Sequence, residues 1–198
     1  MDFREVIMKE KTIGFAVCGS FCTHSAAMGA LEAVRARWNN VIPIVSEVTA
    51  STDTRFGKAA DLVARVEALC GRSVVTTIPD AEPLGPARPM EALVICPCTG
   101  NTLAKLANGI TDTPVCMAAK AHLRSDRPLL ITLASNDALS ANLRNVGTLL
   151  SRKSVYFTPL RQDDPLSKPH SLVADFSKVP EALERALKGE QMRPLFLG

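Results

Sequence analysis

The segment of residues 93–112 reads LVICPCTGNTLAKLANGITD and decides the expected fold. It opens with a short apolar run, residues 93–96, of the length and β-branched content typical of a buried strand. Proline, glycine and hydroxyl residues interrupt the run over residues 97–102. A helical spacing of apolar side chains follows, at Leu103, Leu106, Ala107 and Ile110. This order of strand, polar turn and helix predicts a parallel α/β sheet with the turn above a strand end.

The turn at residues 97–102 has residues suited to binding an anion. The missing Cβ of Gly100 permits close approach, and Thr99, Asn101 and Thr102 can donate hydrogen bonds. Free N–H groups at the start of a helix point toward whatever lies above the strand ends. We therefore predict an anion or phosphate site here. An ordinary capped turn between strand and helix is the alternative.

Strands and helices alternate along the rest of the chain, which predicts an α/β fold with a doubly wound parallel sheet, Rossmann-like and three-layered. Further strands are expected at residues 12–18, 41–45, 73–78, 128–133 and 155–159. Helices are expected at residues 25–37, 56–69, 113–123, 139–151 and 180–188, and loops at 49–54, 79–89 and 161–169. We expect one domain over residues 1–198, with an N-terminal extension at 1–11 and a C-terminal loop and helix at 160–198.

The composition excludes several classes of function. A chain of 198 residues with 46% hydrophobic and 22% charged residues suits one domain with a real core. A net charge of +3, with dispersed Lys and Arg, gives no argument for nucleic acid. No apolar run approaches the roughly 20 residues that span a bilayer, and residues 1–11 do not resemble a signal peptide. We therefore expect a cytoplasmic protein.

The six cysteines indicate reduced thiols rather than a disulfide framework, because several of them lie in apolar runs. The pair Cys96 and Cys98 lacks the two-residue spacer and the second ligand pair of a zinc site. We expect no metal.

Three more turns are expected beside the first one, because the carboxyl ends of parallel strands meet at one edge of the sheet. After the first strand, Gly19, Ser20 and Thr23 can present N–H and O–H donors to a monophosphate. This turn lacks the glycine pattern of a dinucleotide or triphosphate loop. Ser46 ends the second strand, and Asn136 follows the strand at 128–133, where capping of the next helix is the alternative.

Residues 97–112 resemble the Pro-Ala-Ser/Thr-Ala-Asn-Thr segment, and the helix after it, of the flavin-binding cysteine decarboxylase-like flavoproteins. This family includes phosphopantothenoylcysteine decarboxylases and prenylating flavin enzymes. Similarity to one branch of the family covers most of residues 14–175 and is longest over 97–124. The resemblance implies FMN as the cofactor, bound by Gly19, Ser20, Thr23, Ser46, Pro97, Cys98, Thr99, Gly100, Asn101, Thr102 and Asn136.

Members of that branch are B subunits of an oxidoreductase that makes pyridine-2,6-dicarboxylate in the mother cell of sporulating bacteria. The resemblance implies an NAD(P)-binding A subunit as partner, a dihydro precursor as substrate and a homo-oligomer. A substrate with two carboxylates needs cationic partners. Arg55, Lys120 and Arg124 are the substrate candidates, with Lys105 a weaker one.

Two alternative functions stay open, and the sequence assigns no catalytic residue. The chain could be a non-catalytic assembly subunit with an empty flavin pocket, or a decarboxylase-like enzyme. The decarboxylases carry a catalytic histidine in the loop that corresponds to residues 80–89, which has none here. Of the histidines present, His24 could contact a cofactor or cap a helix, His122 fits a buried structural role and His170 fits a solvated loop.

Overall fold

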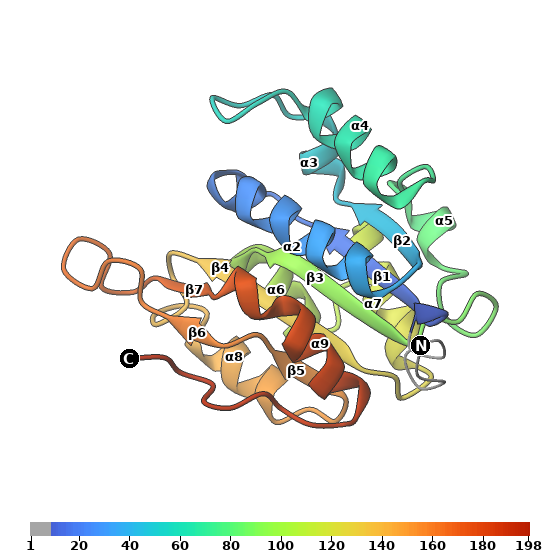
Figure 1. Cartoon of the computed structure of the whole chain (residues 1–198). Helices are drawn as coiled ribbons and strands as arrows, with labels where there is room; N and C mark the ends of the chain where they lie inside the picture. Colours follow the sequence, from blue (N-terminus) through green and yellow to red (C-terminus); the bar gives the residue numbers. More distant parts are fainter. Residues whose placement is uncertain (1–8) are drawn as a thin grey trace.

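The computed structural model describes residues 9–198, so most of the expected N-terminal extension lies outside the described residues. A central sheet carries helices on both faces (Figure 1). Its strands are β1 (Thr12–Val17), β2 (Asn40–Val45), β3 (Ala92–Cys98), β4 (Leu129–Ser135), β5 (Val155–Phe157), β6 (Leu160–Arg161) and β7 (Leu172–Ala174). The helices are α2 (His24–Arg37), α3 (Glu47–Ser51), α4 (Ala59–Cys70), α5 (Ile78–Ala81), α6 (Gly100–Ala107), α7 (Pro114–Leu123), α8 (Leu143–Leu150) and α9 (Val179–Leu187), with short 3-10 helices η1 (Phe21–Thr23) and η2 (Phe176–Lys178).

The sheet has the strand order β2-β1-β3-β4-β7-β6, and β5 also pairs with β4. All pairs among β1 to β5 are parallel, as predicted. From β1 the chain goes outward to β2 and then returns to β3 on the other side of β1. The strand order therefore reverses between β1 and β3. In open α/β sheets, ligands bind in the crevice at such a switch point, outside the carboxyl ends of the strands.

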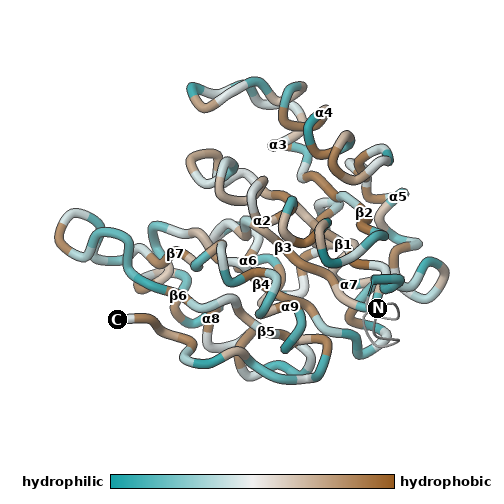
Figure 2. Tube along the Cα trace, viewed as in Figure 1, coloured by the Kyte–Doolittle hydropathy of each residue, from teal (hydrophilic) through white to brown (hydrophobic). Residues whose placement is uncertain are grey.

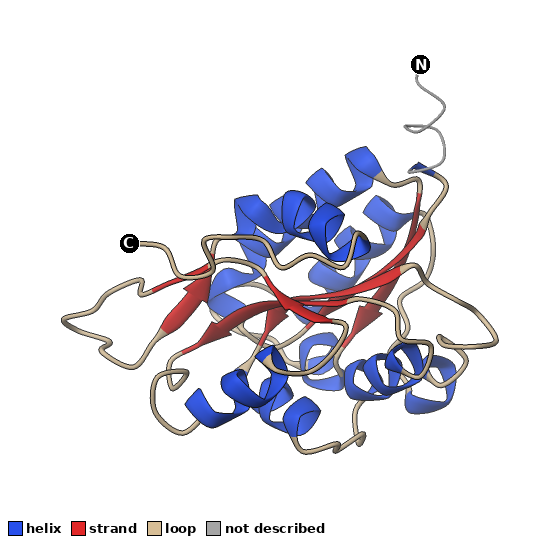
Figure 3. Ribbon diagram, turned by 90° about the horizontal axis from the view of Figure 1, so that it is seen from below, coloured by secondary structure: helices blue, strands red, loops and turns tan. Residues whose placement is uncertain are grey.

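Figure 3 shows the three layers with the sheet edge-on. Two hydrophobic clusters hold these layers together. Side chains alternate along β3, so that Leu93 and Ile95 join one cluster and Val94 and Cys96 the other. Helices α6, α7 and α8 pack on the first face, and α2, α4 and α9 on the second. The apolar strands run through the middle of the molecule, beneath more hydrophilic helices and loops (Figure 2).

The C-terminal part contains a hairpin that the sequence did not predict. The expected strand at residues 155–159 is cut short, because β5 ends at Phe157 and the chain turns into β6. Strand β7 then pairs antiparallel with β6 and with Ala134 and Ser135 of β4. The first half of β4 pairs with β5 and its second half with β7. The loop between β6 and β7, orange in Figure 1, extends away from the body of the molecule.

The prediction of a strand at residues 73–78 was wrong. Only Val75 bridges to the sheet, opposite Ile44. The segment ends where the Thr77 side chain caps α5 by accepting from the Asp80 N–H. Proline at the second position of α5 suits a helix start, because its missing N–H would have had no partner there. The expected loop at 79–89 therefore begins inside a helix.

Several other boundaries differ from the prediction. The expected loop at 49–54 starts within α3, and α4 begins at Ala59 rather than at 56. Strand β3 continues through Cys98, across a cis bond between Cys96 and Pro97, and α6 begins at once after Thr99. Helix α8 begins at Leu143 rather than at 139. No helix in the described residues is long and apolar enough to cross a membrane.

Falling pH is expected to weaken the fold below about pH 6.5, the ordinary pKa of histidine. His122 is 1% exposed and its Nε2 lies 2.9 Å from the Pro128 carbonyl oxygen. Burial lowers the pKa of His122 despite that hydrogen bond, and burial also lowers the pKa of His24. Below pH 6.5 the unfolded chain therefore binds more protons than the folded chain. The free energy of unfolding then decreases as pH falls, and above that range these groups contribute no pH dependence.

Urea unfolding at pH 7.5 and pH 5.5 measures this loss. His122→Gln keeps a donor for the Pro128 carbonyl and should reduce the difference between the two pH values. His170→Gln, at an exposed position in the β6–β7 loop, is the matched control and should not. An unchanged difference in the His122 variant would contradict the assignment.

Candidate functional site

The turns that follow β1, β2 and β3 meet at one edge of the sheet, as the sequence predicted for parallel strands. The Cys18 N–H donates to the Pro97 carbonyl at 3.2 Å, which joins the first turn to the end of β3. The Ser46 N–H donates to the Val17 carbonyl at 3.0 Å, which joins the second turn to β1. The Thr102 hydroxyl contacts the Cys18 sulfur at 3.4 Å. We call this edge, with the turn after β4, the carboxyl rim.

The turn after β1 is compact and internally bonded. Both the N–H and the hydroxyl of Thr23 donate to the Ser20 carbonyl, at 2.9 and 2.8 Å. A Cβ at Gly19 would meet Phe21 at 3.6 Å and Val48 at 3.7 Å, which are ordinary van der Waals distances. A Cβ would therefore fit against these two side chains, so Gly19 is not needed to relieve a clash.

His24 supports the first turn. Its Nε2 lies 2.8 Å from the Cys18 carbonyl oxygen, which fits a neutral ring donating from that nitrogen. Its ring packs edge-to-face on Phe21, with 5.2 Å between centroids. Burial lowers its pKa, so the neutral form is favoured. The ring therefore bonds to the residue after β1 rather than capping a helix, and contact with a cofactor stays a prediction.

The turn after β2 contains a helix cap that the sequence did not predict. Ser46 Oγ accepts from the Thr49 N–H at 3.3 Å and donates to the Thr49 hydroxyl at 2.8 Å. This bonding starts α3 inside the segment expected to be a loop. Ser46 is therefore at the rim, half-buried, with its hydroxyl already bonded within the chain.

The turn after β3 leaves N–H groups at the rim. Thr99 Oγ1 accepts from the Thr102 N–H at 3.2 Å and caps α6. The N–H groups of Gly100 and Asn101 come before the first intrahelical bond, so the helix itself supplies no acceptor for them. The Asn101 side chain is exposed. These donors suit an anion at the start of the helix.

Pro97 and Cys98 are the two members of the predicted turn that lie in the sheet, both buried in β3. Burial raises the pKa of the Cys98 thiol well above its usual value and that of Cys18 to about 12. Both thiols stay protonated at neutral pH, so neither is an activated nucleophile. Their contribution to the rim is packing and backbone geometry.

The turn after β4 holds a polar network that sequence reasoning missed. Asp137 accepts from the Ser135 hydroxyl and from Asn142 Nδ2, the latter at 2.8 Å. Asn145 Nδ2 in turn donates to Asn142 Oδ1 at 2.8 Å. Asn136, the residue predicted to bind the cofactor, is exposed in this turn. The only sequence signal for the network was the run Ser-Asn-Asp after a buried strand, which also fits a helix cap.

Gly100 allows the turn after β3 to pack closely against the turn after β4. A Cβ at Gly100 would lie 2.5 Å from Ser135 Oγ, 2.8 Å from Asn142 Nδ2 and 2.8 Å from Asp137 Oδ1. The polar network therefore occupies the space that any larger residue at Gly100 would need. This close approach fixes the start of α6 against the end of β4.

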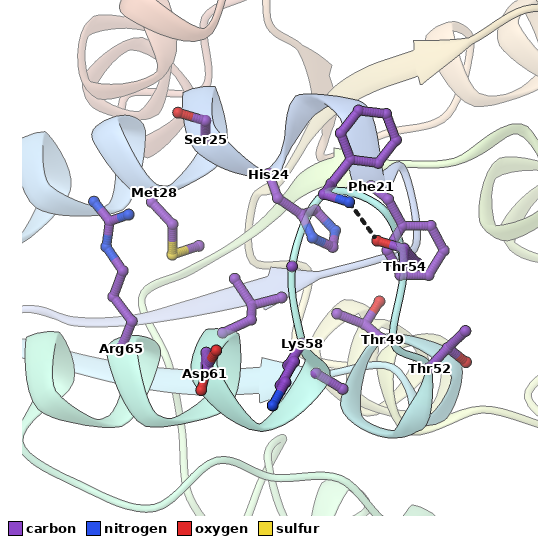
Figure 4. A pocket seen from close by; sticks show the side chains of 14 residues that line it. Phe21, His24, Ser25, Met28, Thr49, Thr52, Thr54, Lys58, Asp61 and Arg65 are labelled. Carbon is purple, nitrogen blue, oxygen red and sulfur yellow. Dashed lines mark hydrogen bonds between the residues drawn. The ribbon is translucent and has the colours of Figure 1, made fainter.

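A cavity of about 230 Å³ opens beside the turns after β1 and β2, between α2, α3 and α4 (Figure 4). Its lining includes His24, Thr49, Thr54, Lys58 and Arg65. The Phe56 N–H donates to Thr54 Oγ1 at 3.1 Å and closes the loop at its mouth. Arg65 pairs with the exposed Glu32 at 2.9 Å, which leaves Lys58 as the lining cation without an ion pair in the described residues.

The structure brings two of the three substrate candidates together, Lys120 and Arg124, and places Arg55 apart from them. Arg55 lies next to the first cavity, with its guanidinium over the Phe56 ring at 4.9 Å. Lys120 and Arg124 line another cavity, on α7 and directly after it. Lys105 is paired with Asp112 at 2.8 Å. Within residues 9–198, no three His, Cys, Asp or Glu side chains gather in a group able to hold a metal ion.

Comparison with protein-family models shows to which family this chain belongs. A family model described as Flavoprotein matches residues 8–168, which include β1 to β6 and the whole rim. The chain belongs to the Flavoprotein family. The fold predicted from the polar turn is therefore the fold of this family.

Known relatives extend the match over almost the whole chain. The chain is 43% identical to the B subunit of dipicolinate synthase from Bacillus subtilis strain 168, over 96% of this chain and 95% of that protein. The crystal structure of the corresponding B subunit from Bacillus halodurans superposes with a TM-score of 0.89 at 37% identity, covering 96% and 98% of the two chains. The FMN-dependent cysteine decarboxylase SpaF shares the fold, with a TM-score of 0.67 at 24% identity over 90% and 98% of the chains.

Proposed function

We propose that this chain is the FMN-binding B subunit of a dipicolinate synthase. In this proposal it acts with an NAD(P)-binding A subunit to oxidise dihydrodipicolinate to pyridine-2,6-dicarboxylate in the cytoplasm of the sporulating mother cell. The observation that carries the proposal is the meeting of four small-residue turns at the β1/β3 switch point, in a chain 43% identical to the B subunit of a dipicolinate synthase.

The rim residues fit a flavin phosphate end. In this proposal the N–H groups of Gly100 and Asn101 would receive the anion, and the missing side chain of Gly19 would allow it to approach the first turn. In this proposal the group would be surrounded by Ser20, Thr23, Ser46, Thr99, Thr102 and Asn136, with Pro97 and Cys98 beneath it. FMN, when bound, would supply the capacity to accept and pass on two electrons. The chain's own residues would bind and orient it and limit the access of water.

The second candidate function is a non-catalytic role in assembling the A subunit's active site. The hydrogen bonding and protonation of the rim residues support it. Cys18 and Cys98 are protonated, His24 is bonded to the chain, and both oxygens of Asp137 accept internal hydrogen bonds. No free general acid or base remains among these described groups. Proton transfer would then come from the substrate, from solvent or from the partner subunit.

Asn101→Ala and Gly19→Val are expected to weaken FMN binding with little loss of fold. Loss of one hydrogen bond to a charged group costs about 1.5–3 kcal/mol, which is on the order of ten- to a hundredfold in Kd. Fluorescence titration of the FMN-free protein measures the affinity, and urea unfolding measures the fold. Asn108→Ala, at the other end of α6, is the matched control and should keep the affinity. Unfolding of either variant to the degree of a core mutation would contradict the placement of these residues.

Reconstitution separates the two candidate functions. The chain is mixed with the A subunit and NAD(P), with and without FMN, and formation of pyridine-2,6-dicarboxylate is followed. Dependence on FMN supports the first candidate. Full activity of a protein that has no affinity for FMN supports the assembly role. The homo-oligomeric state that we also propose is checked by light scattering on the same samples.

A further inference from the structure

A second cavity, of about 300 Å³, lies between α6, α7 and the end of α8. Its size is at the lower end of the range typical of small-molecule pockets. Its walls combine the apolar side chains of Leu106, Ile110 and Leu123 with three cationic side chains, Lys120, Arg124 and Arg152. We call it the basic pocket. No Asp or Glu of the described residues belongs to its lining.

The three cations of the basic pocket lack carboxylate partners within the described chain. The carboxylates nearest in sequence are committed elsewhere, because Asp112 pairs with Lys105 at 2.8 Å and Asp126 with Lys153 at 3.1 Å. Among the ion pairs of residues 9–198, none includes Lys120, Arg124 or Arg152. Like charges gathered in one concave site repel each other, so their convergence favours an anionic ligand.

A purely structural reason explains only part of this arrangement. Lys120 and Arg124 lie at the C-terminal end of α7, where cations interact favourably with the helix dipole. Arg152 does not belong to that helix, since it follows α8 and precedes β5. It reaches the same cavity from a separate part of the chain.

The apolar wall distinguishes among anions. Ile110 is 46% exposed beside the cavity, and Leu106 and Leu123 complete an apolar surface next to the cations. A bare inorganic anion would leave that surface unused, whereas an organic molecule with more than one carboxylate would use both parts. Guanidinium groups bind carboxylates in a bidentate manner. We propose that the basic pocket binds a small organic dicarboxylate.

This site is separate from the carboxyl rim. Arg124 precedes the start of β4 and Arg152 precedes the start of β5, so both lie toward the amino ends of the strands. The rim lies at the opposite ends of the same strands. The basic pocket should therefore bind its ligand without FMN. The use of pyridine-2,6-dicarboxylate as the probe rests on the proposed function.

Calorimetric titration of the FMN-free protein with pyridine-2,6-dicarboxylate tests the proposal. Arg124→Gln and Arg152→Gln each remove one charge at an exposed position and should weaken binding at least about tenfold. Arg144→Gln, exposed on the neighbouring helix α8, removes the same charge outside the pocket and should leave the affinity unchanged. Circular dichroism establishes that all three variants are folded.

Three outcomes would overturn the proposal: no binding of the dicarboxylate, equal binding by all variants, or binding of inorganic phosphate as tight as that of the dicarboxylate. FMN titration of the same variants keeps this test apart from the test of the proposed function. The affinity for FMN should be unaltered in Arg124→Gln and Arg152→Gln. If the protein binds the dicarboxylate but not FMN, the proposal for the basic pocket is supported and the proposed FMN-binding function is contradicted.

Discussion

Gly100→Ala is expected to destabilise the folded chain by about 1–3 kcal/mol, the usual cost of inserting a methyl group into a filled site. All three nearest atoms to the new Cβ would lie at 2.5–2.8 Å, closer than carbon can approach without displacement. These atoms belong to Ser135, Asp137 and Asn142, which hold one another by hydrogen bonds. Moving one of them leaves partners unsatisfied, which adds to the steric cost.

Gly29→Ala is the matched control for this substitution. Gly29 lies within α2, and a Cβ there would meet nothing within 4 Å. Because alanine favours helix over glycine, the control should be more stable by up to about 1 kcal/mol. Thermal unfolding compares the two, at roughly 2–4 °C per kcal/mol for a chain of this size. Adding Ser135→Ala to the Gly100 variant should recover part of the loss. Equal stability of both glycine variants would contradict the described packing.

Trp38→Ala is expected to destabilise the chain by about 3–5 kcal/mol. Trp38 is 1% exposed and is among the largest fully buried side chains. It joins the cluster that packs α2, α4 and α9 on one face of the sheet. Its removal would leave a cavity where α2 ends and the chain enters β2. Urea unfolding measures the loss.

Trp38→Phe separates the two properties of the indole. Trp38 Nε1 is buried without a hydrogen-bond acceptor in the described residues. Phenylalanine keeps much of the volume and removes that unpaired donor, whose burial costs about 1–3 kcal/mol. The phenylalanine variant should therefore lose much less stability than the alanine variant. Similar losses in both would indicate that the indole N–H has an acceptor.

The sequence predicted the central sheet because its strands are continuous apolar runs bounded by turn residues. Strands β1, β2, β3 and β4 lie close to where their runs lie, and each is buried on both faces. The apolar content of residues 73–78 suggested a fifth such run, but this segment meets only the margin of the sheet at Val75. Strands β6 and β7 have two and three residues, too short to leave a periodic signal.

The rim was predictable in part for a topological reason. Parallel strands place their carboxyl ends together, so residues far apart in sequence, such as Gly19 and Asn101, could be assigned to one edge. What the sequence could not indicate was which hydroxyls are already bonded: Ser46 and Thr99 both cap helices. Nor could it group Arg152 with Lys120, since both reach one cavity only because α7 and α8 each pack against α6.

The divided pairing of β4 has a consequence for synthesis on the ribosome. Its outer edge is covered by two segments, β5 and β7, that are both translated later. Until β5 and β7 have left the exit tunnel, a nascent chain with β1 to β4 in place carries a largely apolar strand with open backbone groups along one side. Such an edge pairs readily with other chains. Ribosome-stalled or truncated forms of this protein that end before β5 should thus be strong chaperone clients, and the complete chain should not.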